Sequence, residues 1–137
     1  MLRPETKVRA RALQLLYAWD IQDRSPMAEV AHGVLSVHGG RGREWGAAEN
    51  LATEVASTAG TLDGQIAAVA DHWRMSRIGV VERNILRIGM HELSVTDTPA
   101  PVIISEALRL AHWFAGPKSV PFVNGVLDTL ARQCRRL

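Results

Sequence analysis

The sequence is poor in the residues that cross-link, anchor or export a protein. It has one cysteine among 137 residues, Cys134, which excludes an internal disulfide. No run of about 18 uncharged apolar residues is present, so we expect no segment to span a membrane. The first residues carry charges where a signal peptide needs an apolar core. We therefore expect a cytoplasmic protein whose single thiol, at an apolar helical position, is buried and inert.

The sequence also lacks the motifs of common enzymes. His91-Glu92 begins like the zinc-protease pattern H-E-x-x-H, but Val95 stands where the second histidine belongs. A single cysteine provides no paired spacing for a zinc site. Neither a nucleophile elbow nor a dinucleotide-binding fingerprint is present. We expect a protein without catalytic residues, metal or cofactor.

The composition favours one ordinary globular domain. Apolar residues make up 47% of the chain and charged residues 22%, which is typical of globular proteins. A chain of this length usually forms one domain and buries roughly two-thirds of its unfolded surface, enough for a core without covalent cross-links. We therefore predict a single domain over residues 1–137.

Positive charge is concentrated at the two ends of the chain, although the formal net charge is only +2. Residues 132–137 contain three arginines, and residues 1–11 contain four basic side chains against one glutamate: Arg3, Lys7, Arg9 and Arg11. The rest of the chain is therefore net acidic. Local basic clusters favour an anionic partner such as nucleic acid, although solvated terminal charges that only maintain solubility explain the same pattern.

Apolar residues follow helical spacing through most of the chain, and no strand-like alternation is present. One face of a first helix, residues 4–22, carries Val8, Ala12, Leu15 and Trp19. Further helices are predicted over 26–38, over 48–73 with an interruption near Gly60, and around 78–93. Two C-terminal helices follow, separated by Gly116-Pro117. The predicted fold is all-α, a compact bundle of six or seven helices around one core.

Three blocks of sequence resemble the NusB family of bacterial transcription antitermination factors. The blocks are Ala12-Leu13-Gln14-Leu15-Leu16-Tyr17 with Trp19; Val81-Glu82-Arg83, Ile85-Leu86-Arg87-Ile88 and Glu92-Leu93; and Ile104-Ser105-Glu106-Ala107, Phe114 and Phe122-Val123-Asn124-Gly125-Val126-Leu127-Asp128. They span most of the chain, and residues 24–60 match least. The resemblance implies a small helical RNA-binding adaptor with two helical subdomains.

The resemblance further implies binding of single-stranded boxA-type RNA from ribosomal RNA leader transcripts. Affinity for RNA comes largely from neutralised phosphates, and unpaired bases are stacked on aromatic or guanidinium planes. The RNA-binding residues implied in this way are Arg3, Lys7, Arg9, Arg11, Lys118, Phe122 and Asn124. Phe122 is either a base-stacking ring or a core side chain, and Asn124 either contacts a base edge or caps a neighbouring helix.

The implied protein partners are NusE, which is also a small-subunit ribosomal protein, and the RNA polymerase antitermination complex. The implied NusE-binding residues are Tyr17, Ile21, Glu82 and Phe114. Tyr17 and Ile21 are four residues apart, so a helix places them in one patch. The alternative is that Tyr17 and Phe114 close the edge of the core. Some relatives form homodimers, so a homodimer is a further possibility.

Two other functions remain as alternatives. Some RNA cytosine methyltransferases carry an N-terminal domain of this fold, but here the chain ends at Leu137, and we expect no room for a cofactor-binding sheet. A purely protein-binding helical module would bind its partners without salt-dependent affinity for RNA. Lys118 and Pro121 depart from the family pattern, which commonly has an acidic residue at the first position and a basic residue at the second.

Overall fold

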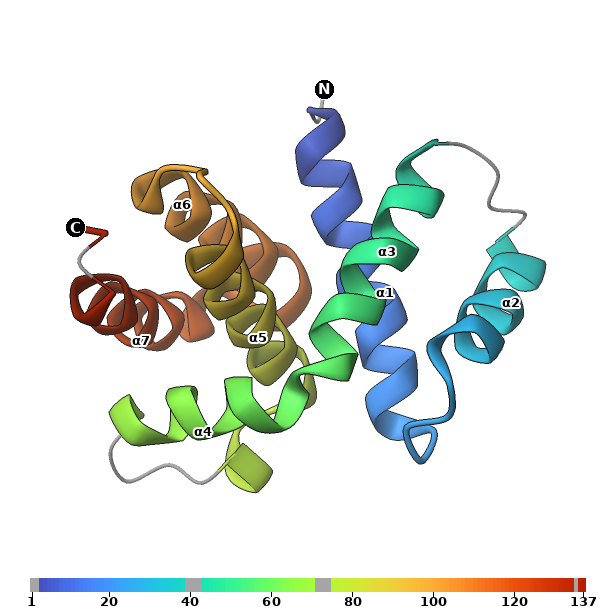
Figure 1. Ribbon diagram of the computed structural model, residues 1–137, viewed down its shortest axis with the longest axis horizontal. Helices are drawn as coiled ribbons and strands as arrows, with labels where there is room; N and C mark the ends of the chain where they lie inside the picture. Colours follow the sequence, from blue (N-terminus) through green and yellow to red (C-terminus); the bar gives the residue numbers. More distant parts are fainter. Residues whose placement is uncertain (1–2, 39–42, 71–74, 135) are drawn as a thin grey trace. The chain divides into compact units, whose positions relative to one another are not determined.

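The computed structural model describes residues 3–38, 43–70, 75–134 and 136–137. Within these ranges the regular structure is helical, with seven α-helices and three short helical turns (Figure 1). The predicted all-α fold and the number of helices are therefore confirmed. The chain divides into two compact units, Met1–Thr58 and Ala59–Leu137, which we call the N-terminal and C-terminal units. The predicted extension of a helix to Trp73 lies outside the described residues.

The N-terminal unit consists of α1 (Pro4–Ile21), α2 (Met27–His38) and α3 (Arg43–Ser57). Its core is formed mainly where α3 runs alongside α1 (Figure 1). Ala12 and Leu15 of α1 and Ala48 and Ala52 of α3 are completely buried. Alanine side chains let two helices approach closely, and water is excluded at these four positions. Pro4 is the first residue of α1, a position that requires no backbone N–H donor.

The C-terminal unit contains α4 (Ala59–Val69), α5 (Val80–Val95), α6 (Ala100–Leu110) and α7 (Val120–Gln133). Helix α5 lies at the centre of this unit and packs on the other three helices (Figure 1). Residues 84–93 of α5 are all buried. This burial on every side explains why apolar residues cover more than one face of α5 in the sequence.

The break between α6 and α7 contains an unusual helical turn. Ala111–Ala115 forms a π-helical turn, η2, in which the Gly116 N–H donates to the Ala111 carbonyl at 2.9 Å. Gly116 then has a φ of 102°, a conformation that favours glycine. Pro117–Ser119 forms a short 3₁₀ turn, η3, which leads into α7. The helix break predicted at Gly116-Pro117 is confirmed.

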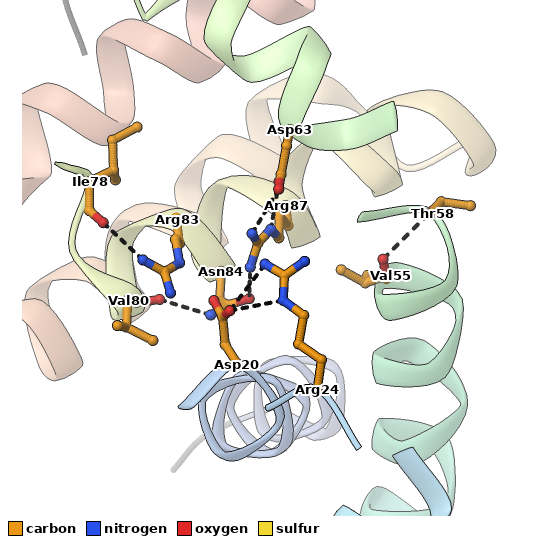
Figure 2. A network of polar contacts seen from close by, with 10 residues as sticks. All are labelled: Asp20, Arg24, Val55, Thr58, Asp63, Ile78, Val80, Arg83, Asn84 and Arg87. Atoms are coloured by element: carbon orange, nitrogen blue, oxygen red, sulfur yellow. Dashed lines mark hydrogen bonds and ion pairs between the residues drawn. The ribbon is translucent and has the colours of Figure 1, made fainter. Parts of the chain in front are cut away.

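A buried polar network joins α4 to α5 inside the C-terminal unit (Figure 2). The Arg87 side chain is 1% exposed, and its Nε and Nη2 donate to the two carboxylate oxygens of Asp63 at 2.7 and 2.9 Å. Its Nη1 donates to Asn84 Oδ1 at 2.8 Å, and Asn84 Nδ2 donates to the Val80 carbonyl at 2.8 Å. Burying a guanidinium is tolerable here because its donors meet a carboxylate and an amide.

One expectation about the C-terminus is wrong. Cys134 is exposed rather than buried, because it follows α7 after that helix ends at Gln133. The Arg136 guanidinium of the basic C-terminal cluster donates to the carbonyls of Leu93 and Thr96 at 2.7 and 3.2 Å, and to that of Thr98. These carbonyls lie in and just after the last turn of α5, where a cation is stabilising. Arg135 lies outside the described residues.

Candidate nucleic-acid interface

One face of α1 carries most of the site residues predicted for the N-terminal unit. With 100° of rotation per residue, a narrow row of side chains on this helix lies away from the residues that are most buried. We call this row the outward stripe. Its members are Arg3, Lys7, Arg11, Gln14, Tyr17 and Ile21, all exposed or half-buried. The first half of the outward stripe is therefore basic, and the second half carries an aromatic and an aliphatic side chain.

The basic half of the outward stripe is smaller than the sequence predicts. Arg3 and Lys7 are exposed, one helical turn apart. Arg9 lies two residues from Lys7, which is roughly 200° around a helix, and it is 9% exposed. Its side chain is packed on the face of α1 opposite to Lys7. The structure thus brings Arg3, Lys7 and Arg11 together and turns Arg9 away from them.

Arg11 is half-buried against another helix of the same unit. Its guanidinium carbon lies 5.1 Å from the centroid of the Trp45 ring, near the start of α3. Its Nη1 also donates a 3.1 Å hydrogen bond to Gln14 Oε1. Analysis of the sequence missed Trp45, because a contact across 34 residues leaves no local pattern that could reveal it.

Tyr17 and Ile21 form an exposed patch on the second half of the outward stripe. Tyr17 is 42% exposed and Ile21 is 52% exposed. Their spacing of four residues places them on adjacent turns of α1. These exposures favour a surface position for Tyr17 over the alternative in which it closes the edge of the core.

A cavity of about 230 Å³ in the C-terminal unit is lined by several of the predicted site residues. It brings Glu82, Lys118 and Phe122 together, although they come from α5, η3 and α7. The other lining residues are Arg77, Ile78, Gly79 and Ser119. A cation, a carboxylate and an aromatic ring around one hollow provide charge, hydrogen bonding and an apolar surface, the combination typical of a ligand-binding surface.

Glu82 is held in place by the start of α5. It is the third residue of that helix, where the helix dipole stabilises a carboxylate. Ser119 Oγ donates to Glu82 Oε2 at 3.0 Å. The carboxylate folds back over Gly79, because a Cβ atom there would lie only 2.5 Å from Glu82 Oε1. A glycine before α5 therefore leaves room for the carboxylate at the wall of the cavity.

The remaining predicted residues of the C-terminal unit differ in exposure. Phe122 is half-buried, so part of its ring is open to the cavity and part is packed. Asn124 is exposed inside α7, four residues after the start of that helix. Phe114 is 42% exposed on the π-helical turn η2 and does not line the cavity. Lys118 is exposed on η3.

The chain as a whole matches a known family. The model of the NusB family matches residues 6–132. The chain belongs to the NusB family. It is 37% identical to the transcription antitermination protein NusB of Solibacter usitatus, over 93% of this chain and 88% of the relative. It is also 37% identical to the protein of the same name from Serratia proteamaculans, over 98% of this chain and 99% of the relative.

Solved structures of the NusB family share the fold. A crystal structure of NusB from T. maritima matches with a TM-score of 0.84 at 25% identity, over 97% of this chain and 94% of the other. A chain in a crystal structure of the antitermination factors NusB and NusE in complex with double-stranded RNA matches with a TM-score of 0.83 at 26% identity, over 97% and 99%. Among the described residues of the present chain, no helix has the length and apolar character needed to cross a bilayer.

Proposed function

We propose that this NusB-family protein is an RNA-binding adaptor in transcription antitermination of ribosomal RNA operons. It binds boxA-type single-stranded RNA together with NusE, in the cytoplasm, as part of an RNA polymerase antitermination complex. The observation that carries the proposal is the outward stripe of α1, which presents basic side chains and an apolar patch along one helix. Support comes from the relatives named as antitermination proteins and from the matching chain in a complex of NusB and NusE with double-stranded RNA.

The basic half of the outward stripe supplies the attraction to RNA. Arg3 and Lys7 are exposed and four residues apart, which separates them by about 6 Å along the helix axis. Two cations at that separation neutralise neighbouring phosphates of one strand. Each phosphate contact on a single strand steepens the dependence of log affinity on log salt by roughly 0.7. Phosphate contacts hold the strand in place but do not distinguish its bases.

The cavity of the C-terminal unit supplies a second set of RNA contacts. Phe122 exposes part of an aromatic ring on which a base can stack, and Lys118 adds a cation at the same hollow. Asn124 presents an amide that both donates and accepts hydrogen bonds, as recognition of a base edge requires. In this proposal Lys118 replaces charge that other family members place at the position of Pro121.

The apolar patches contact NusE. Tyr17 and Ile21 offer an aromatic and an aliphatic side chain on the N-terminal unit, and Phe114 offers an exposed ring on the C-terminal unit. Aromatic side chains are enriched in the cores of protein interfaces. Glu82 adds a carboxylate near Ser119 that can pair with a basic partner residue. A homodimer that covers the same surfaces would compete with NusE and RNA.

The proposal is tested by titrating labelled boxA RNA with the protein at several salt concentrations, with and without NusE. The wild-type protein should bind in a salt-dependent manner and more tightly with NusE. Replacing Arg3 and Lys7 by alanine removes two phosphate contacts and should flatten the log–log slope by about 1.4. Arg132→Ala is the control, because Arg132 pairs with Asp128 at 3.0 Å on the surface of α7.

Three results would contradict the proposal. Absence of salt-dependent RNA binding, with or without NusE, would favour the protein-binding module. An unchanged slope in the Arg3 and Lys7 variant would remove α1 from the RNA site. A change in the mass of the RNA after incubation with the protein and a methyl donor would indicate catalysis and favour the methyltransferase alternative.

A further inference from the structure

Arg11 differs from the other cations of the outward stripe because its side chain is fixed. Its guanidinium carbon lies over the Trp45 ring at 5.1 Å from the centroid, within the range of a cation–π contact. Gln14 accepts a 3.1 Å hydrogen bond from Arg11 Nη1. Trp45 is buried in the N-terminal unit, so the ring beneath the guanidinium is itself held by packing. The result is a planar cation in a fixed position that remains partly open to solvent.

The positive charge of Arg11 is not neutralised by the described residues. Its partners among them are an amide and an aromatic ring, and neither carries a negative charge. Its Nε is buried and has no hydrogen-bond partner among the described residues. A buried donor without an acceptor is costly. The charge of the guanidinium, by contrast, can be balanced by an anionic ligand that meets its open side.

Arg24 and Trp19 make the same kind of cation–π contact in the same unit, but Arg24 also pairs with a carboxylate. The guanidinium carbon of Arg24 lies 4.6 Å from the centroid of the Trp19 ring. Its Nη2 lies 3.1 Å from Asp20 Oδ1, and Nε donates to the same oxygen at 3.3 Å (Figure 2). This arginine is therefore already paired with a carboxylate. The charge of Arg24 is thus balanced within the protein, whereas Arg11 can pair with an anionic ligand.

We propose that Arg11, positioned by Trp45 and Gln14, is a stacking platform for one unpaired base of the bound RNA. The inference rests on the proposed function and assigns a base-contacting residue within it. Guanidinium planes stack on bases that are splayed out of a single strand. Lys7 lies one helical turn before Arg11 on the same stripe, so it is placed to hold a phosphate of the same stretch of strand. Trp45 and Gln14 act as positioning residues and do not touch the RNA.

The test uses the full chain with NusE and a series of boxA RNAs from which one base at a time is removed while the phosphates remain. Removal of the stacked base should weaken binding to the wild-type protein by about tenfold, the scale of stacking on one side chain. Arg11→Lys keeps the charge but loses the planar face. This variant should bind the intact RNA about tenfold more weakly and be indifferent to removal of that one base. Its salt dependence should be unchanged, because the number of phosphate contacts is the same.

Two further variants separate stacking on the RNA from a structural role. Trp45→Leu removes the ring that positions the guanidinium and should show the same loss as Arg11→Lys, whereas Trp45→Phe keeps a ring and should lose less. Thermal melting followed by circular dichroism establishes whether each variant is folded, and Arg11→Lys decides the question if a Trp45 variant is not. Arg24→Lys is the matched control and should bind every RNA of the series as the wild-type protein does.

The outcomes distinguish failure of this inference from failure of the proposed function. If Arg11→Lys binds the whole series like the wild-type protein, Arg11 is not a base contact, while RNA binding by the protein remains established. If Arg11→Lys weakens every RNA equally, including the one that lacks the assigned base, Arg11 contacts a phosphate and the platform is wrong. If the wild-type protein shows no salt-dependent RNA binding, the proposed function itself fails.

Discussion

Arg87 and Asp63 form a two-bond ion pair that ties α5 to α4. Arg87 Nε donates to Asp63 Oδ1 at 2.7 Å, and Nη2 donates to Oδ2 at 2.9 Å. The guanidinium is almost fully buried, whereas the carboxylate keeps 22% of its exposure. Arg87 has therefore lost its hydration, and the Asp63 carboxylate helps to balance its charge. The pair joins two helices of the C-terminal unit and helps to position the helix that carries Glu82.

Asp63→Ala should destabilise the protein by about 3–5 kcal/mol, because it removes the carboxylate that accepts two hydrogen bonds from a buried guanidinium. Chemical denaturation followed by circular dichroism measures the change in free energy of unfolding. Asp128→Ala is the matched control, since it breaks an exposed pair with Arg132, and it should cost no more than about 0.5 kcal/mol. Equal losses in the two variants would show that the Arg87 pair has no special energetic role.

Gly89→Ala and Gly125→Ala should change stability in opposite directions. A Cβ atom at Gly89 would lie 2.8 Å from Leu127 Cδ2, and Leu127 is completely buried, so we expect a loss of about 1–3 kcal/mol from overpacking. A Cβ atom at Gly125 meets nothing within 4 Å. Gly125→Ala should therefore gain up to about 1 kcal/mol from helix propensity. Thermal melting of both variants checks the signs, and a stabilising Gly89→Ala would contradict the close packing of α5 on α7.

Arg136→Ala should destabilise the C-terminal unit by about 1–3 kcal/mol, because the last carbonyls of α5 lose a charged donor. The same change should leave the salt dependence of RNA binding as it is, since this guanidinium is engaged by Leu93, Thr96 and Thr98. Hydrogen exchange at the end of α5 and an RNA titration measure the two effects. Arg132→Ala, which removes a neighbouring exposed cation, should leave both unchanged. A flatter salt slope in Arg136→Ala would contradict this and place Arg136 in the RNA site.

Tyr17→Ala combined with Ile21→Ala should weaken NusE binding by tenfold or more, because truncated interface aromatics commonly cost more than about 1 kcal/mol. Both side chains are exposed, so the stability of the protein should change little. Isothermal titration with NusE measures the affinity. Val37→Ala is the control, as Val37 is an exposed apolar residue of α2 in the same unit. Unchanged affinity of the Tyr17 and Ile21 variant would remove the patch from the interface.

Local patterns in the sequence were sufficient to predict most of the helices. The spacing of Ala12, Leu15 and Trp19 predicts α1, and all three are buried. Gly116-Pro117 predicts the break between α6 and α7, because glycine and proline restrict the backbone wherever they occur. These signals act within a few residues, so they do not depend on how distant parts of the chain pack. The family resemblance also followed from the sequence, and the match over residues 6–132 confirms it.

The sequence predicted the site residues only in part, because a residue's type does not tell whether its side chain is exposed. Arg9 and Lys7 look equivalent as basic residues of one helix, yet packing buries the first and exposes the second. Arg136 counts as one more positive charge in the sequence, but its guanidinium donates to the Leu93 carbonyl in the last turn of α5. The helical apolar spacing predicts a buried Cys134, but α7 ends at Gln133 and Cys134 is exposed.

The sequence by itself determined the positions of most helices, the resemblance to the NusB family and the clustering of positive charge at the two ends of the chain. Tertiary structure alone decided which charged side chains are paired or hydrogen-bonded within the protein. Arg87 meets Asp63 across 24 residues and Arg11 meets Trp45 across 34. Such pairs depend on the packing of whole helices, which is set by the burial of apolar surface over each unit rather than by any short stretch of sequence.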